Sequence, residues 1–473
     1  MNKRITIVLL ALMIVAGLLP VALGADPSGG ATLADDPLAP LTYIWLLVAG
    51  FLVFFMQAGF AMVEAGFTRA KNTANILMKN IMDFAVGSLA FMAVGYGLMM
   101  GADHYGLFGT GMWFLAGDAY DVGVYLNWFF MVVFAATAAT IVSGAMAERT
   151  KFKSYLMYSV IISLIIYPVY GHWVWGGGWL MTGSIFGKLG LLATDGSPLW
   201  FADFAGSSVV HQLGGWIALM GAVMLGPRIG KYGKDGEPRA IPGHNIALAV
   251  LGGFILWFGW YGFNAGSTLS GTELRIAVIV VTTTLAAAAG ATIAMFYSWA
   301  RIGKPDVGMT VNGFLAGLVA ITAGTAWVGA PEAVLIGAIA GFLVVEAVLF
   351  IENRGVDDPV GAVAVHGVNG FWGTIAVGLF ADGTYGNYAV PGVGNPAIVG
   401  LFHGGGTGQL IVQFIGAGAA LLWALAAGFI MFKGIDMLFG LRVSHDEEIE
   451  GLDIGEHGIS AYPDFVIART EGE

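Results

Sequence analysis

The sequence predicts an all-α membrane protein with eleven transmembrane helices, arranged as two inverted five-helix repeats plus a final long helix, N-out/C-in. Of its 473 residues, 57% are hydrophobic and 11% are charged, whereas soluble domains carry about 25% charged residues. Eleven apolar segments are long enough for a hydrocarbon core of about 30 Å. Positive charges gather in alternate loops. These observations exclude a soluble protein, and the formal charge of -11 gives no sign of nucleic-acid binding.

The N-terminal segment has the order of a secretory signal peptide. Lys3 and Arg4 precede an apolar stretch, residues 5–23, which ends in small residues around Gly24. A charged, then apolar, then small-residue order is typical of a cleaved leader. We therefore predict a signal peptide at residues 1–24, with an ordinary first membrane helix as the alternative. The membrane domain is expected at residues 25–440 and a cytoplasmic tail at residues 441–473.

The apolar segments and the loop charges together define a topology. The eleven segments lie near residues 42–64, 76–100, 124–147, 154–170, 203–225, 246–266, 276–299, 311–328, 333–351, 361–381 and 408–439. With the mature N-terminus outside, the external loops hold only Lys188 and Arg275. The cytoplasmic side then holds Arg69, Lys71, Lys79, Arg149, Lys151, Lys153, Arg228, Lys231, Lys234, Arg239, Arg301, Lys304, Arg354, Lys433, Arg442 and Arg469. This asymmetry sets the predicted orientation.

An odd helix count places segments one to five and six to ten in opposite orientations, which is the plan of an inverted repeat with its site between the halves. The sequence contains a weak trace of this repeat. Segment five has His211 followed by Gly215 and Trp216, and segment ten has His366 followed by Gly370 and Phe371. Each fifth helix thus carries a histidine, a glycine four residues later and then an aromatic residue.

His211 and His366 are the candidate pore residues because each lies well inside an apolar span. At 1.5 Å per residue, His211 is about 12 Å from the outer end of its helix and His366 about 8 Å from the cytoplasmic end of its own. An ionisable residue inside a membrane is a functional hypothesis by default. The alternative is that each imidazole bonds a nearby backbone carbonyl. The six other histidines lie in loops or near span ends, and we interpret them as ordinary polar residues of wet regions.

Two neutral imidazoles are suited to binding an uncharged ligand. Transferring an ammonium-sized ion to a low-dielectric medium costs on the order of 20 kcal/mol in the idealised limit. Neutral ammonia avoids this cost, and each neutral imidazole offers one donor and one acceptor. A haem- or metal-binding membrane enzyme is the rival use of the pair. The chain has no cysteine, no HExxH motif and no carboxylate beside either histidine, so we expect no metal, no cofactor and no enzymatic activity.

Aromatic residues are expected above the histidines, on the outer side. Phe130 and Phe134 are four residues apart and share one helical face, and Phe263 ends segment six close to Ser267. Trp175 lies in the neighbouring external stretch. An aromatic face attracts a cation by about 2 kcal/mol or more when desolvated. The alternative is the interfacial aromatic belt of membrane proteins. Asp203 begins segment five, where capping of the helix start is its first expected role, with added negative potential at a cation entrance as the second.

The chain resembles the ammonium transporters of the Amt/Mep/Rh family, Amt/Mep branch, over nearly the whole mature length. The motifs that carry the resemblance are Gln57-Ala58-Gly59-Phe60-Ala61-Met62-Val63-Glu64-Ala65-Gly66, Arg69-Ala70-Lys71-Asn72, Gly144-Ala145-Met146-Ala147-Glu148-Arg149, Asp203-Phe204-Ala205-Gly206, Gly262-Phe263-Asn264-Ala265-Gly266-Ser267, Asp357-Asp358-Pro359 and Val365-His366-Gly367. The resemblance implies a homotrimer in which each protomer has its own pore.

The resemblance also implies roles for individual residues. His211 and His366 would be the pore histidines, and Thr322 a pore-side hydroxyl. Phe130 and Phe263 would form a stacked aromatic gate. The outer ammonium site would consist of Trp175, Ser267 and Phe130, with Asp203 as the acidic residue beside it.

The tail fits the same family, whose cytoplasmic tail couples protomers and is read by PII-type signalling proteins. Ile459 departs from the glutamate that the family often has, and Gly361 from an acidic residue common in bacterial members. The expected location is the bacterial or archaeal plasma membrane, in contact with lipid. The sequence does not separate ammonium from methylammonium as substrate. A sensor with little flux is a further alternative, although the tail is short for an output domain.

Overall fold

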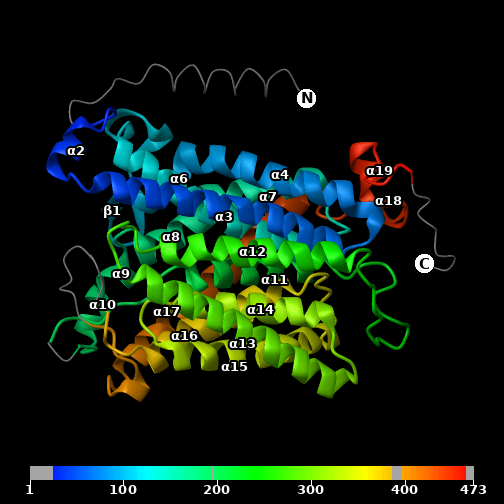
Figure 1. Ribbon diagram of the computed structural model, residues 1–473. Helices are drawn as coiled ribbons and strands as arrows, with labels where there is room; N and C mark the ends of the chain where they lie inside the picture. The colour runs from blue at the N-terminus through cyan, green and yellow to red at the C-terminus, as the bar shows by residue number, and fades with distance from the viewer. Residues whose placement is uncertain (1–24, 194–195, 386–396, 465–473) are drawn as a thin grey trace.

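The protein is a bundle of long helices lying side by side (Figure 1). The computed structural model describes residues 25–193, 196–385 and 397–464, so the predicted signal peptide lies outside the described residues. The helices of the bundle, several of them continued through π-helical turns labelled η, are α3 (Ala39–Phe67), α4 (Thr73–Ala90) with η2 (Phe91–Gly95) and α5 (Tyr96–Met100), α6 (Val122–Ala145), α7 (Phe152–Ile161) with η5 (Ile162–Ile166) and α8 (Tyr167–Trp175), η6 (Ser207–Gln212) with α11 (Leu213–Leu225), α12 (Ile246–Gly266), α13 (Ile276–Ile302), α14 (Val307–Thr322), α15 (Ala330–Asn353), η7 (Val363–Val368) with α16 (Asn369–Phe380), and α17 (Gly408–Phe439).

The remaining elements are short and lie at the two ends of the bundle or in its loops. They are α2 (Gly30–Asp35), strands β1 (Ala102–His104) and β2 (Phe108–Thr110), α9 (Trp179–Thr182), α10 (Ser184–Lys188), α18 (His445–Glu450) and α19 (Leu452–His457). Four short 3-10 helices also carry the label η: η1 (Ala70–Asn72), η3 (Trp113–Leu115), η4 (Gly117–Ala119) and η8 (Leu401–His403). The two strands pair antiparallel as one small hairpin. In Figure 1, α2, β1 and α10 lie at one end and the tail helices α18 and α19 at the other.

The predicted fold class is confirmed, since every predicted segment corresponds to a helix. Within the described ranges, ten helical spans have the length and apolarity to cross a membrane, and α14, with 16 residues, is shorter. The chain is therefore a multi-pass helical membrane protein. The exact number of crossings and the N-out/C-in orientation stay predictions. We call the end with Trp175 and Asp203 the aromatic end, and the end with Glu148, Arg228 and the tail the charged end.

Glycine lets the first helices of the two predicted halves, α3 and α12, touch along their length. A Cβ built on Gly59 would lie 3.0 Å from the Gly252 carbonyl oxygen, and one on Gly66 would lie 2.4 Å from the Ala249 nitrogen. Neither gap admits a side chain. Small residues allow such backbone approach between membrane helices, where packing replaces the hydrophobic effect as the driving force.

A reciprocal glycine contact joins the fifth helix of each half. A Cβ on Gly215 would lie 2.1 Å from the Gly367 nitrogen, and one on Gly370 would lie 2.6 Å from the Ser207 oxygen. Each glycine four residues after a histidine therefore lies against the backbone of the turn that carries the other histidine. This contact gives a physical reason for the repeated His-to-Gly spacing in the sequence.

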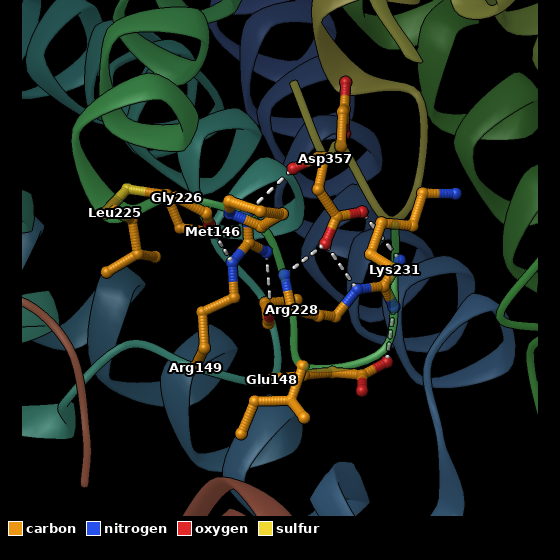
Figure 2. A network of polar contacts seen from close by, with 12 residues as sticks. Met146, Glu148, Arg149, Leu225, Gly226, Arg228, Lys231 and Asp357 are labelled. Carbon is orange, nitrogen blue, oxygen red and sulfur yellow. Dashed lines mark hydrogen bonds and ion pairs between the residues drawn. The ribbon is translucent and has the colours of Figure 1, made fainter. Parts of the chain in front are cut away.

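A buried network of charges fastens the loops at the charged end (Figure 2). Arg228 bonds the Asp357 carboxylate through Nε at 2.8 Å and Nη2 at 2.9 Å, and it bonds Glu148 through Nη1 at 2.9 Å. Arg149 donates to the Asp357 carbonyl oxygen at 2.7 Å, and Arg69 pairs with Glu148 at 2.5 Å. The network thus joins the segments that follow α6 and α11 to the segment that precedes η7.

The charges in this network stabilise one another. Burial alone would raise the pKa of Glu148, but the guanidinium groups of Arg228 and Arg69 hold it below its usual value. Burial likewise opposes ionisation of Asp357, yet hydrogen bonds and charge from Arg228, with Arg149 nearby, hold its pKa below the usual range. Both side chains are therefore ionised and paired at neutral pH.

The tail is folded against the charged end of the bundle. The Asp453 carboxylate accepts a hydrogen bond from the Asn75 backbone at 2.8 Å, and Glu456 accepts one from the Phe152 backbone at 3.1 Å. Asp453 and Glu456 thus bind the amide groups of the first turns of α4 and α7, where unpaired N–H groups are available.

Candidate functional site: a histidine pair between two cavities

The two candidate pore histidines meet in the middle of the bundle. The Nδ1 atoms of His211 and His366 are 3.2 Å apart, and the two rings stack with centroids 5.2 Å apart and planes 20° apart. His211 is fully buried and His366 is 6% exposed. Each lies in a π-helical turn, His211 in η6 and His366 in η7. π-helical turns are rare and frequently occur at functional sites.

Thr322 is linked to the histidine pair through Trp260. The Trp260 ring stacks on His211 with centroids 4.9 Å apart, and its Nε1 donates to the Thr322 hydroxyl at 2.8 Å. The same hydroxyl donates to the Leu318 carbonyl at 2.7 Å. The assignment of Thr322 as a pore-side hydroxyl stays a prediction; the structure shows that this hydroxyl accepts a hydrogen bond from the indole that packs on His211.

Aromatic rings form a column from the histidines towards the aromatic end. Phe263 stacks on His211 with ring centroids 5.3 Å apart. Phe134 packs on Phe263 at 4.1 Å and Phe130 on Phe134 at 4.8 Å, both in tilted arrangements. The predicted gate of Phe130 on Phe263 is therefore corrected, because Phe134 is the ring that contacts Phe263. Phe130 lies one helical turn away from Phe134, so it is the next ring outward.

A cavity of about 120 Å³ lies at the end of this column that is farther from the histidines. Phe130, Trp175, Asp203 and Ser267 all line it, together with Phe134. The structure thus brings together the four residues expected to form the outer site. Its walls are mostly apolar and rich in aromatic rings, and Asp203 and Ser267 are the acidic residue and the hydroxyl residue among those that line it.

Asp203 has a structural role at this cavity. Its carboxylate accepts hydrogen bonds from the backbone N–H groups of Gly206 at 2.8 Å, Ser208 at 2.8 Å and Val209 at 3.0 Å. Its carbonyl accepts one from Trp175 Nε1 at 2.8 Å. These contacts agree with the capping role expected first for Asp203, and they also fix the Trp175 indole at the cavity wall.

Two further cavities lie on the other side of the histidines. A space of about 30 Å³ is lined by His366, Glu64, Thr140 and Asn312, among others. Asn312 and Val360 also line a much larger cavity of about 1020 Å³ at the charged end. The histidine pair therefore lies between the aromatic cavity and the two cavities towards the charged end.

Glu64 is the site residue that sequence reasoning missed. The sequence has no carboxylate beside either histidine, but α3 brings Glu64 into the cavity that His366 lines. Its motif was visible only as part of the family resemblance. Elsewhere in the described ranges, no three His, Asp or Glu side chains converge in a way that would hold a metal ion.

Buried rings in a column between two cavities at opposite ends of an apolar helix bundle define a membrane transport protein with a narrow passage. The family is shown by comparison with known proteins. A sequence profile of the Ammonium Transporter Family matches residues 44–462, and the chain belongs to this family.

Individual relatives agree with this assignment. Ammonium transporter Amt2 of Archaeoglobus fulgidus is 58% identical over 464 residues, which cover 98% of this chain and 96% of the relative. Ammonium transporter Amt1 of Haloferax mediterranei is 42% identical, with 90% and 80% covered. Among solved structures, one described as Sensor Amt Protein has a TM-score of 0.79 at 38% identity, covering 89% of this chain and all of that chain. Candida albicans Mep2 has a TM-score of 0.77 at 28% identity, with 95% and 98% covered.

Proposed function

We propose that this protein transports ammonium across the plasma membrane. Ammonium binds in the aromatic cavity, which the predicted orientation makes the outer one, and gives up its proton there, either to external water or to a separate proton relay. Ammonia then passes the aromatic column and the histidine pair and regains a proton on the cytoplasmic side. The observation that carries the proposal is the stacked His211–His366 pair, buried between the two cavities.

The outer cavity suits recruitment of a small cation. The faces of Phe130 and Trp175 line it beside the hydroxyl of Ser267 and the carboxylate of Asp203. A desolvated cation over an aromatic ring gains about 2 kcal/mol or more. That gain is small beside the idealised cost of about 20 kcal/mol for taking the ion into the low-dielectric interior. The cation therefore binds at the entrance, while only the neutral base proceeds.

The hydrogen-bond pattern of the pair suits ammonia. A contact of 3.2 Å between two Nδ1 atoms requires an N–H on one ring and a lone pair on the other. Of the two Nε2 atoms, one is then an acceptor and the other a donor. Ammonia has both a lone pair and N–H groups, so it can bond to each in turn. A potassium ion cannot lose a proton and meets no fixed negative charge at the pair.

We extend the proposal to the assembly and its partners. The family resemblance supports a homotrimer embedded in lipid, with one pore in each protomer. The same resemblance supports a PII-type signalling protein at the cytoplasmic face, where the tail is folded against α4 and α7. Residues 441–473 are then a regulatory tail, and residues 1–24 a signal peptide. Methylammonium is the substrate analogue to compare with ammonium.

The test is transport by the purified protein in reconstituted vesicles, with His211→Ala and His366→Ala beside the wild type. Each substitution removes one hydrogen bond to ammonia, worth about 1–1.5 kcal/mol, so flux should fall by about tenfold. Discrimination against potassium should also fall, because the loss of one imidazole opens the space between the two helices. His104→Ala is the control, because His104 is exposed in β1. If both pore variants keep full flux and full discrimination against potassium, the mechanism is wrong. A wild type that binds ammonium without flux would favour the sensor alternative.

A further inference from the structure

A second group of ionisable side chains is buried beside the pore, between α3, α4, α6 and α7. We call Glu64, Lys79 and Asp83 the polar cluster; all three are at most 2% exposed. Ser143 on α6 donates to Glu64 Oε2 at 2.8 Å, and Ser159 on α7 donates to Asp83. Of these side chains, only Glu64 was placed in the passage above, as a residue that lines the cavity of His366.

The polar cluster is poorly satisfied by the protein itself. Glu64 Oε1, Lys79 Nζ and Asp83 Oδ2 have no hydrogen-bond partner among the described residues. The hydroxyl of Tyr158, which faces the cluster from α7, is also without one. A buried polar group left unpaired costs about 1–3 kcal/mol, and in native proteins such groups are normally bonded to water or used in function. So many unpaired atoms in one place indicate a role that protein contacts do not fill.

Glu64 is the member of the polar cluster that reaches the pore. It lines the cavity of about 30 Å³ that His366 also lines. One water molecule occupies about that volume in the liquid, so the cavity has room for a single water or ammonia molecule. Neither Lys79 nor Asp83 lines this cavity. Asn312 and Val360 line both this cavity and the large cavity at the charged end, so the two cavities are neighbours. An ammonia molecule that leaves His366 therefore meets the Glu64 carboxyl group before it reaches open water.

We propose that Glu64 is the acid that converts ammonia back to ammonium after it passes His366, and that its carboxylate then holds the cation as it leaves. This inference rests on the proposed function and assigns its inner proton-transfer site. In the step, the O–H bond of the Glu64 carboxylic acid breaks, and the lone pair of ammonia forms the new N–H bond. Ammonium and a carboxylate result, and no electron is gained or lost. Ammonium leaves through the large cavity, and a cytoplasmic proton, delivered through its water, restores the acid.

The surroundings of Glu64 fit a group that alternates between two charge states. Lys79 and Asp83 face it from α4, Tyr155 and Tyr158 from α7, and His366 from η7. Ser143 keeps one Glu64 oxygen in place in both charge states. Its hydroxyl can donate a hydrogen bond to the carboxylate and also to the carbonyl oxygen of the carboxylic acid. The positive charge on Lys79 lies close enough to stabilise the carboxylate after the proton leaves. Lys79 is therefore a positioning residue in this proposal.

The experiment compares Glu64→Gln, Glu64→Asp and Asp83→Asn with the wild type in vesicles of fixed orientation. The initial rate of ammonium uptake is measured over a series of inner pH values with a constant outer pH. The wild-type rate falls as the inner pH rises, because the Glu64 acid is increasingly deprotonated. Glu64→Gln has no proton to give, so its rate is at least about tenfold lower and independent of inner pH. Glu64→Asp restores a pH-dependent rate.

Asp83→Asn is the matched control, since Asp83 belongs to the same polar cluster but does not line the cavity. It retains the wild-type dependence on inner pH. The inference is overturned if Glu64→Gln keeps the wild-type pH profile, if Glu64→Asp is as flat as Glu64→Gln, or if Asp83→Asn becomes flat as well. A wild type without uptake overturns the proposed function itself, whereas an active wild type with an unchanged Glu64→Gln overturns only the role of Glu64.

Discussion

The charged-end network and the polar cluster are both groups of buried charges, and they differ in how completely their members are paired. In the network at the charged end, the Arg228 guanidinium contacts both Asp357 and Glu148 directly. In the polar cluster, Glu64 and Asp83 are bonded to serine hydroxyls. Lys79 has no hydrogen-bond partner among the described residues. Both groups are buried, so solvent exposure does not explain the difference.

The difference separates structural charges from charges available for chemistry. A buried ion pair is stable when its geometry is good and its other hydrogen bonds are satisfied, and breaking one is costly. The charged-end network meets these conditions and fastens three loops. The polar cluster does not meet them, and one of its members lines the passage. We therefore expect variants of the network to lose stability, and variants of Glu64, the member of the polar cluster that lines the passage, to lose transport.

The largest expected effect is that of Arg228→Ala on stability. Removing the guanidinium leaves the carboxylates of Glu148 and Asp357 buried with one partner fewer each, which costs about 3–5 kcal/mol. The midpoint of thermal unfolding in detergent should fall clearly below that of the wild type. Lys234→Ala, an exposed residue of the same loop, is the control. Equal midpoints for the two variants would contradict the structural role of the network.

Acid should weaken the network by a smaller amount. The folded-state pKa values of Glu148 and Asp357 lie below their usual values, which are about 4 in unfolded chains. Their contribution to stability is therefore complete above about pH 4 and is lost as the pH falls through the lower, folded values. We expect a loss on the order of 1–3 kcal/mol, measured as a falling unfolding midpoint below about pH 4.

Asp357→Asn provides the control for this acid effect. The variant has no carboxyl group to protonate at residue 357, so its unfolding midpoint should depend less on acid than that of the wild type. An identical acid dependence in the two proteins would show that other groups are responsible.

The smallest expected effect on stability is that of Asp83→Asn. The amide oxygen can still accept the Ser159 hydrogen bond, and the substitution removes a buried charge that has no charged hydrogen-bond partner. We expect a change of about 1 kcal/mol or less in the free energy of unfolding. Asp357→Asn at neutral pH should be clearly more destabilising. If Asp83→Asn and Asp357→Asn were equally destabilising, the ion pairs of the charged-end network would not distinguish its stability from that of the polar cluster.

The sequence predicted the helices and the histidine pair because both depend on local pattern. Long apolar runs locate membrane helices, and a polar residue inside such a run stands out. Helix ends were less certain. The fourth predicted segment ended at residue 170, but α8 continues to Trp175. His172, interpreted as a residue of a wet region, is in fact fully buried and bonds the Met99 carbonyl at 2.8 Å and Asp103 at 2.9 Å.

Three features of the site depended on tertiary packing that the sequence does not contain. Phe130 and Phe134 share a helix face, so spacing alone did not reveal which of them contacts Phe263. The hydrogen bond that the Thr322 hydroxyl accepts comes from Trp260, which lies on another helix. Glu64 reaches the cavity of His366 only because α3 packs beside η7, far away in the chain.

The backbone contact between the two histidine-bearing helices has a consequence for how the passage behaves in a changing membrane. Gly215 and Gly370 press directly on the main chain of the opposite helix, so the spacing of the imidazoles is fixed by peptide groups instead of by adjustable side chains. Thermal motion or a change in bilayer thickness can then tilt the surrounding helices without changing the distance between the two imidazoles. Selectivity should then vary little between cold and warm cells, or between thin and thick bilayers, even where the rate of uptake changes.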